Sequence, residues 1–290
     1  MTIHGPGTAN PNVVHLADFQ PPAKIFTIWE RHRHAKARWL AECFAEFVSV
    51  GSTAPWVVGN AIGETGLSSI FQIGVAYASG IVFAICFCSG TSGGHFNPSV
   101  TIACCLFKDF PKMKGLRYIV AQILGGYVAC LLIYVQYKHL LDEAEGAMML
   151  AGTFSELQFT PRAPAGIFGL YLLPGAKMGQ VFLNEFVADV MLAIVIWGSI
   201  DPTNILVPPQ AKPYVIALGY AVAIWGFSFP GLAANAARDV GGRLAALTIY
   251  GRKASGGSYA ALAALTNVPA TVVGVLLYEL FLADSQRAAR

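Results

Sequence analysis

Charged side chains are scarce in this sequence: Asp, Glu, Lys and Arg make up 12% of its 290 residues, while 55% are hydrophobic. Soluble domains carry about 25% charged residues. A surface with so little charge cannot face water on all sides, which excludes an ordinary soluble protein and indicates lipid as the solvent. The net charge of +3 is too small to indicate a nucleic-acid partner.

Patterns typical of metal, cofactor and catalytic sites are also missing. The six cysteines form no CxxC pair and no His-containing metal pattern, so we expect neither a metal ion nor a cofactor. A membrane-embedded enzyme would need a cluster of His or carboxylate side chains at one depth. His95 is the one His clearly within an apolar segment, and Glu46 and Glu185 fall in opposite halves of the chain. We therefore do not expect an enzyme.

Residues 1–38 contain no apolar stretch of the kind found in a cleavable signal peptide. They are rich in Pro, His and Asn and end in a basic run, so we expect a disordered tail. After them, six stretches approach the roughly 20 apolar residues that a bilayer core requires. These predicted spans are Trp39–Ile62, Ser69–Gly90, Tyr118–Tyr137, Gln180–Ile200, Pro213–Phe229 and Tyr259–Leu282.

Lys and Arg in the short connecting segments predict the orientation, because cytoplasmic loops carry an excess of both. The N-terminal tail and the link from Lys108 to Arg117 are basic, whereas the link 63–68 has neither residue. The tail and the second link are therefore expected in the cytoplasm, with the C-terminus on the same side, and the membrane is expected to be the plasma membrane. One region departs from this rule, with four cations on the predicted outer side: Arg238, Arg243, Arg252 and Lys253.

Two apolar segments are too short to cross a membrane. The first runs from Asn97 to Phe107, 11 residues, or about 16 Å as a helix, which is about half of a hydrocarbon core of roughly 30 Å. The second runs from Asn235 to Tyr250. A Gly-rich entry precedes each, which predicts re-entrant loops, and irregular backbone at that depth is tolerated only where protein buries it or water lines it.

The two halves of the chain repeat one another. Glu46 lies 51 positions before Asn97, and Glu185 lies 50 positions before Asn235. A three-span unit repeated once has inverted topology, the layout of solute pathways. The predicted fold is all-α and integral to the membrane, with six transmembrane helices and two half-membrane helices. Its predicted parts are a tail 1–38, a channel domain 39–282 with repeats 39–137 and 180–282 joined by an outer loop 138–179, and a C-terminal tail 283–290.

By this symmetry Asn97 and Asn235 start half-helices that meet near the bilayer centre. Either residue alone would be explained as an ordinary N-cap. Two in equivalent frames indicate more: their amide groups can donate to a passing oxygen, while the positive helix ends repel cations. An oxygen held by both donors cannot accept from a neighbouring water, which breaks the chain along which protons move.

The motifs Ser92-Gly-Gly-His-Phe-Asn-Pro-Ser-Val-Thr101 and Asn235-Ala-Ala-Arg-Asp-Val-Gly-Gly-Arg-Leu244 closely resemble the paired signatures of the aquaporins, the major intrinsic proteins. The resemblance implies a homotetramer with Asn97 and Asn235 as the central pair and Glu46 and Glu185 as braces of the loops. It also implies a selectivity filter and a ladder of carbonyl groups. In aquaporin-type pores, selectivity comes from the pore width, an Arg and the dipoles of the half-helices. The implied filter is Tyr77, Leu232, Arg238 and Ala223, or Ile224 with a one-residue shift; the implied ladder includes Gly94, His95, Phe96, Gly231, Leu232 and Ala233.

Several of these residues also have ordinary structural explanations. Tyr77 alone could be an interfacial tyrosine, and Leu232 alone a core residue. For the two glutamates the alternative to bracing is a functional one, a proton relay. Two positions depart from the family pattern: Ala236 replaces the proline after the second asparagine, and Ser99 replaces an alanine.

An apolar wall opposite Arg238 favours glycerol, whose carbons and hydroxyl groups lie on opposite sides. Asp239, Arg243, Val268-Pro269-Ala270 and the long outer link also resemble the glycerol-conducting branch of the family. The expected function is a passive channel for glycerol and water that excludes ions and protons. A water-selective channel, or one for urea or hydrogen peroxide, remains open because Leu232 replaces the branch's usual aromatic residue.

A secondary transporter is the alternative of another class, since transporters also have inverted repeats and broken helices. It would couple to an ion through carboxylates facing a cavity, whereas the predicted pore residues are amides, carbonyls and one Arg. Saturable counterflow would distinguish a transporter from a channel.

Overall fold

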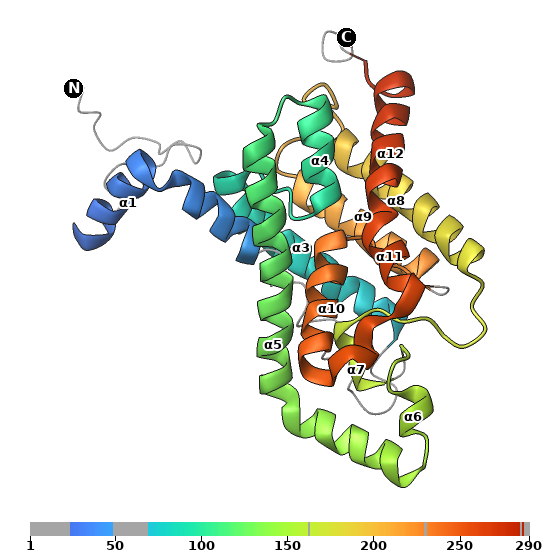
Figure 1. Ribbon diagram of the computed structural model, residues 1–290. Helices are drawn as coiled ribbons and strands as arrows, with labels where there is room; N and C mark the ends of the chain where they lie inside the picture. The colour runs from blue at the N-terminus through green and yellow to red at the C-terminus, as the bar shows by residue number, and fades with distance from the viewer. Residues whose placement is uncertain (1–23, 49–68, 162, 229–230, 285, 287–290) are drawn as a thin grey trace, which may run out of the picture. The chain divides into compact units, whose positions relative to one another are not determined.

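The structure is a computed structural model that describes residues 24–48, 69–161, 163–228, 231–284 and 286. Every element of regular secondary structure within these ranges is a helix (Figure 1). The chain divides into two compact units, Met1–Leu40 and Ala41–Arg290, each of which is described separately.

The first unit contains helix α1 (Lys24–Lys36). The expectation of a disordered tail over 1–38 is therefore wrong for these residues. The segment carries good helix formers such as Lys, Glu and Arg. Its last turn is basic, which complements the negative end of the helix dipole, and His34 lies 3.7 Å from Glu30 one turn earlier. Local propensity outweighs the polar composition here.

Among the described residues of the second unit, four helical segments are long and apolar enough to cross a membrane. They are α3 (Ile70–Ser92), α5 (Lys112–Leu150), α8 (Met178–Ile200), and α11 (Gly257–Leu265) with α12 (Asn267–Phe281). Helix α9 (Lys212–Phe227) has 16 residues, about 24 Å, which is shorter than a bilayer core. Residues 39–48 of the first predicted span are helical, and the remainder to Ile62, with the link 63–68, lies outside the described residues.

Helix α5 continues well past its predicted end at Tyr137. It runs to Leu150, and its final turns bend away from the rest of the helix (Figure 1). The extension is rich in helix formers, and Lys138 pairs with Asp142 one turn later at 2.6 Å. Further along, the predicted outer loop 138–179 also contains α6 (Phe154–Leu157) and α7 (Pro164–Phe168). Much of that segment is therefore helical, and α7 packs against α5 and α10.

The last predicted span is interrupted at Thr266, between α11 and α12. Pro269 explains the position of the break. A proline has no backbone N–H, and its ring clashes with the carbonyl group four residues earlier, which here belongs to Leu265. Helix α11 ends at that residue.

The two half-helices are α4 (Pro98–Phe107) and α10 (Ala236–Tyr250), and α10 is followed by the short 3-10 helix η2 (Gly251–Ser255). Helix α4 packs against α5 and α12, and α10 packs against α5 and α11. The approach of α10 to α5 is close: a Cβ atom on Gly241 would lie 2.7 Å from the Ile123 carbonyl oxygen. Glycine permits this contact, as in many membrane helix pairs.

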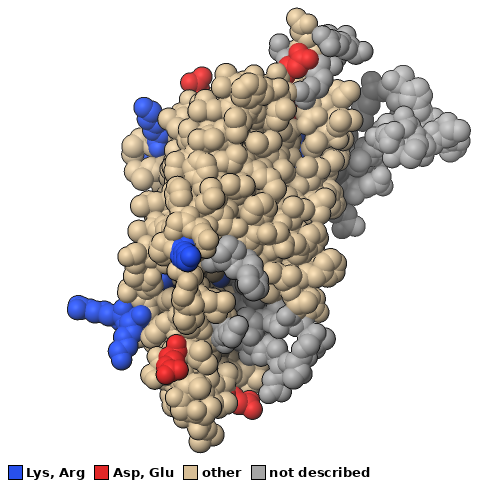
Figure 2. All heavy atoms as spheres, turned by 90° about the vertical axis from the view of Figure 1, so that its right-hand side faces the viewer, with Lys and Arg blue, Asp and Glu red and all other residues tan. Residues whose placement is uncertain are grey.

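Large apolar side chains face outward on the second unit. Phe87, Val135 and Leu132 are 79%, 74% and 65% exposed. On the face shown in Figure 2, Lys, Arg, Asp and Glu lie mostly toward the two ends, and a wide uncharged zone separates them. Such an apolar exterior is suited to lipid rather than to water.

Candidate conduction pathway

Asn97 and Asn235 cap the two half-helices in the same way. The Asn97 side-chain oxygen accepts from the Ser99 N–H at 3.0 Å, and that of Asn235 accepts from the Ala237 N–H at 2.9 Å. Both residues have the extended backbone of an N-cap. Because each amide oxygen is occupied by its own helix, each side chain presents its NH₂ group, a double donor, on the other side.

The two helix starts are joined by reciprocal hydrogen bonds. Asn97 Nδ2 donates to the Ala234 carbonyl at 3.1 Å, and Asn235 Nδ2 donates to the Phe96 carbonyl at 2.9 Å. Each asparagine thus bonds the residue that precedes the other asparagine. The structure therefore brings the two predicted central residues together.

The residues before the asparagines have a strained backbone. Phe96 and Ala234 both have φ of 53°, a left-handed conformation that non-glycine residues rarely adopt. Such a residue costs roughly 1–3 kcal/mol and persists where its surroundings hold it. The matching φ values show that the two loops share one backbone design.

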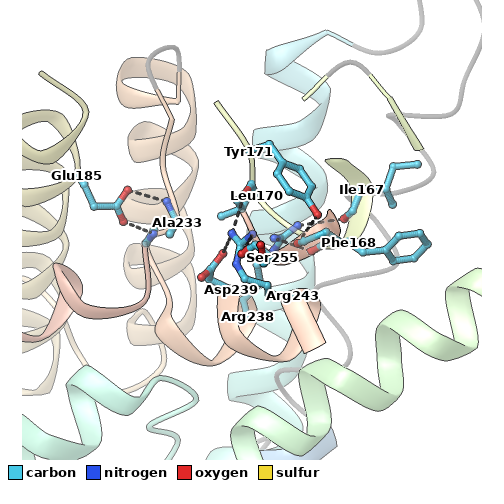
Figure 3. Close-up of polar contacts among 12 residues, drawn as sticks. Ile167, Phe168, Leu170, Tyr171, Glu185, Ala233, Arg238, Asp239, Arg243 and Ser255 are labelled. Carbon is cyan, nitrogen blue, oxygen red and sulfur yellow. Dashed lines mark hydrogen bonds and ion pairs between the residues drawn. The ribbon is translucent and has the colours of Figure 1, made fainter. Parts of the chain in front are cut away.

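Two fully buried carboxylates hold these strained residues. Glu46 accepts from the His95 and Phe96 N–H groups at 3.0 and 2.7 Å. Glu185 accepts from the Ala233 and Ala234 N–H groups at 2.7 and 2.8 Å (Figure 3). Each carboxylate satisfies two consecutive donors that would otherwise be buried without partners. This is the bracing contact expected of both residues.

Arg238 is nearly buried, and its guanidinium group is fixed by backbone oxygens. It donates to the carbonyl groups of Phe168 and Ile167, both at 3.2 Å. These carbonyls belong to the last residues of α7. Figure 3 shows the guanidinium group directed at them. The folded part of the long link therefore positions the predicted filter arginine.

A second arginine ties the same link to α10. Arg243 donates to the Leu170 carbonyl at 2.6 Å and to Asp239 at 3.0 Å, and it also contacts the Ser255 carbonyl (Figure 3). Nearby, burial raises the pKa of Tyr171 to about 12, so its hydroxyl group keeps its proton and donates to a carbonyl of η2. Two of the cations that break the charge rule are therefore buried structural groups.

Two cavities lie next to the asparagine pair, and we name them outer and inner after the orientation that the sequence predicts. The outer cavity has a volume of about 180 Å³. Arg238 lines it together with three of the side chains discussed for the filter, Tyr77, Ile224 and Leu232. Ala233 also lines it. Ala223, the first choice for the fifth-span position, is fully buried in the core beside Tyr220. Of the two residues left open for this position, the structure places Ile224 at the cavity, because one residue along a helix turns a side chain by about 100°.

A smaller cavity of about 50 Å³ lies on the inner side, where Asn235 lines it. Three predicted ladder residues, Gly94, His95 and Phe96, lie along its wall. Gly231 instead lines a separate, larger cavity of about 560 Å³. Its carbonyl group accepts from Asn184, and that of Ala233 accepts from the Asn235 N–H, so each has one lone pair left.

Sequence reasoning missed Tyr220 on α9, which lines both cavities. Its ring packs against that of Tyr77, with 6.1 Å between ring centroids. The available signal was its spacing: Tyr220 lies four residues before Ile224, on the same face of the helix. No motif marks that face, because α9 is apolar around its whole circumference.

Comparison with known proteins agrees with this geometry. The family model described as Major intrinsic protein matches residues 28–253. The chain belongs to the major intrinsic protein family. Its relatives in this family include Aquaporin-3 of Laccaria bicolor, 52% identical over 285 residues, which cover 95% of this chain and 86% of that protein. The propanediol uptake facilitator PduF of Salmonella typhimurium is 36% identical over 211 residues, which cover 70% and 77%.

A solved structure shares the fold. The aquaglyceroporin from Plasmodium falciparum superposes with a TM-score of 0.73 at 21% identity and covers 84% of this chain and 97% of its own. The predicted aquaporin fold is confirmed. As a major intrinsic protein, the chain is an integral membrane channel for water or small solutes, and it is not an enzyme.

Proposed function

We propose that this channel conducts glycerol together with water and excludes ions and protons. The outer cavity carries the proposal, because Arg238 lines it together with the apolar side chains of Ile224 and Leu232 and the ring of Tyr77. A molecule with hydroxyl groups on one side and carbons on the other can bond the guanidinium group while it contacts the apolar wall. Water alone does not need such a wall.

Exclusion of ions follows from two positive features on the pathway. The Arg238 guanidinium group is a permanent charge that opposes cations. Deeper in, the half-helices α4 and α10 direct their N-terminal ends, with Asn97 and Asn235, at the midplane. The amide groups of Asn97 and Asn235 donate to a passing oxygen, so that oxygen cannot accept from the next water. The proton path is broken there.

The relatives favour a small polyol without deciding the solute. One relative is called a propanediol uptake facilitator, and the structural neighbour is called an aquaglyceroporin. Aquaporin-3 of Laccaria bicolor carries no solute in its name. The cavity chemistry is therefore the main support for glycerol.

Assembly and orientation belong to the same proposal. We expect a homotetramer in the plasma membrane, with both termini and the basic turn Lys108–Lys114 on the cytoplasmic side. Chemical cross-linking in native membranes and protease access to the tail test these points; cross-linked species no larger than dimers would contradict the tetramer.

Swelling of proteoliposomes tests the solute. Vesicles with purified protein are mixed with glycerol, urea, hydrogen peroxide or an impermeant sugar, and light scattering follows their volume. We expect water flux with the sugar and rapid re-swelling with glycerol, both above protein-free vesicles. The Arg252→Ala variant is a matched control, because Arg252 lies in η2 and is exposed. Water flux without glycerol re-swelling would contradict the proposed solute.

A further inference from the structure

The outer and inner cavities have Tyr77 and Tyr220 in common. The cavity volume falls from about 180 Å³ on the outer side of these residues to about 50 Å³ on the inner side. Tyr77 lies on α3 and Tyr220 on α9, two helices that pack together. The two tyrosines therefore lie between the larger cavity and the smaller one.

The two rings act as one wall. Their planes differ by 30°, and their centroids are 6.1 Å apart, so the rings pack against each other instead of facing each other across a gap. Both side chains are more than 90% buried, and Leu192 and Ala217 pack behind them. A wall supported in this way cannot easily move aside for a wider solute.

Polar groups also lie beside the rings at this level. Asn235 lines the inner cavity with the rings, and Ala234 lines the outer cavity with them. Tyr220 also lies beside the Asn97 side chain. The amide donors thus lie next to an aromatic surface, and a polyol at this level contacts the rings with its carbons while its hydroxyl groups face the amides.

We propose that Tyr220 sets the upper size limit of the solute at this second narrow point, deeper in the pathway than Arg238. The inference rests on the proposed conduction of small polyols. Arg238 and its neighbours select for amphipathic solutes at the outer cavity. The Tyr220 ring then limits how much carbon can pass the asparagine pair.

Polyols of increasing length test this proposal in vesicles that hold the full-length protein. Glycerol, erythritol and xylitol carry three, four and five carbons. Shortening the side chain in Tyr220→Leu should raise the xylitol-to-glycerol permeability ratio about tenfold, the low end of what one methylene decides in a fitted apolar site. Tyr220→Trp should lower glycerol flux by a similar factor and water flux by less. Retained water flux shows that each variant is folded.

Two controls separate ring size from other causes. Tyr214→Leu makes the same change on the outward side of α9, where Tyr214 is 61% exposed, and should leave the ratio unchanged. Tyr220→Phe keeps the ring and removes the hydroxyl group, so xylitol should still be excluded. The proposal would be overturned if the xylitol-to-glycerol permeability ratio of Tyr220→Leu were within twofold of that of Tyr214→Leu. Entry of xylitol through the Tyr220→Phe variant would also overturn it.

The proposed function can fail separately. Wild-type protein that conducts water but no glycerol would refute the solute. The size limit would then lie below three carbons, and Tyr220→Leu should admit glycerol. Continued exclusion of glycerol by that variant would refute the role of Tyr220 as well.

Discussion

In the first re-entrant loop Pro98 follows Asn97, whereas in the second loop Ala236 follows Asn235. Proline at the first helical position sets φ in advance and gives up an N–H group that has no partner in its own helix. The second half-helix lacks this preorganisation, although its asparagine caps two N–H groups and that of the first helix caps one. The same backbone design is thus stabilised by different local means in the two repeats.

The carboxylates that brace the loops also differ. Glu46 accepts a third hydrogen bond, from Gln122 Nε2 at 2.6 Å. Glu185 instead has a second fully buried carboxyl group beside it, that of Asp189, which also lies next to Asn267. The first loop is held by the helices around it, while the second depends more on Arg238, Arg243 and the link that they bind. We therefore expect the two loops to respond differently to matched substitutions.

The largest effect should come from removing the braces. Glu46→Ala removes three hydrogen bonds to a charged group, each worth roughly 1.5–3 kcal/mol, and Glu185→Ala removes two. Loss of Glu185 also takes a carboxyl group away from Asp189, which offsets part of the cost. Glu46→Ala should therefore lower the unfolding midpoint more, as measured by tryptophan fluorescence in detergent. An equal or larger drop for Glu185→Ala would contradict the difference between the loops.

The two arginines of the second loop should separate selectivity from stability. Arg238→Ala removes the charge that lines the outer cavity, so proton or cation leak should rise about tenfold, equivalent to 1.4 kcal/mol of barrier. Arg243→Ala breaks three hydrogen bonds and leaves Asp239 buried without its cation, so it should destabilise the fold without adding leak. A pH-sensitive dye inside proteoliposomes measures the leak. Unchanged proton exclusion in Arg238→Ala would count against its place in the filter.

The sequence predicted this site where local patterns specify it. The two asparagine caps lie in short motifs, and the two glutamates lie at matched distances before them. In the structure each asparagine bonds the loop of the other repeat, and each glutamate bonds the loop of its own repeat. The choice between Ala223 and Ile224 depends on the rotation of α9, which a uniformly apolar helix does not reveal. The missed role of Tyr220 has the same cause. The extension of α5 could not be predicted from hydropathy, because helix formation continues beyond the apolar segment.

A smaller effect should follow from making the two loops alike. Ala236→Pro places a proline at the first position of α10, where its backbone angle fits and no helical N–H bond is lost. Such substitutions stabilise by about 0.4–1 kcal/mol through the unfolded state. The unfolding midpoint should rise slightly, and Pro98→Ala should lower it by a comparable amount. A fall in stability for Ala236→Pro would show that the second loop needs the freedom or space that alanine leaves.

The smallest effect tests whether the loops are independent. Asn267 on α12 contacts both of them: it accepts from the Ser99 hydroxyl group of the first, and its amide lies 3.4 Å from the Ala234 carbonyl oxygen of the second. Ser99→Ala should cost about 1 kcal/mol, as one neutral hydrogen bond does. If Asn267 couples the loops, the double variant Ser99→Ala with Ala236→Pro should change the free energy of unfolding by an amount that differs from the sum of the two single changes. The difference should be at least about 0.5 kcal/mol. The four unfolding midpoints measure this deviation, with Thr248→Ala in place of Ser99→Ala as an exposed control. Additive effects in both cycles would mean that each loop is stabilised within its own repeat.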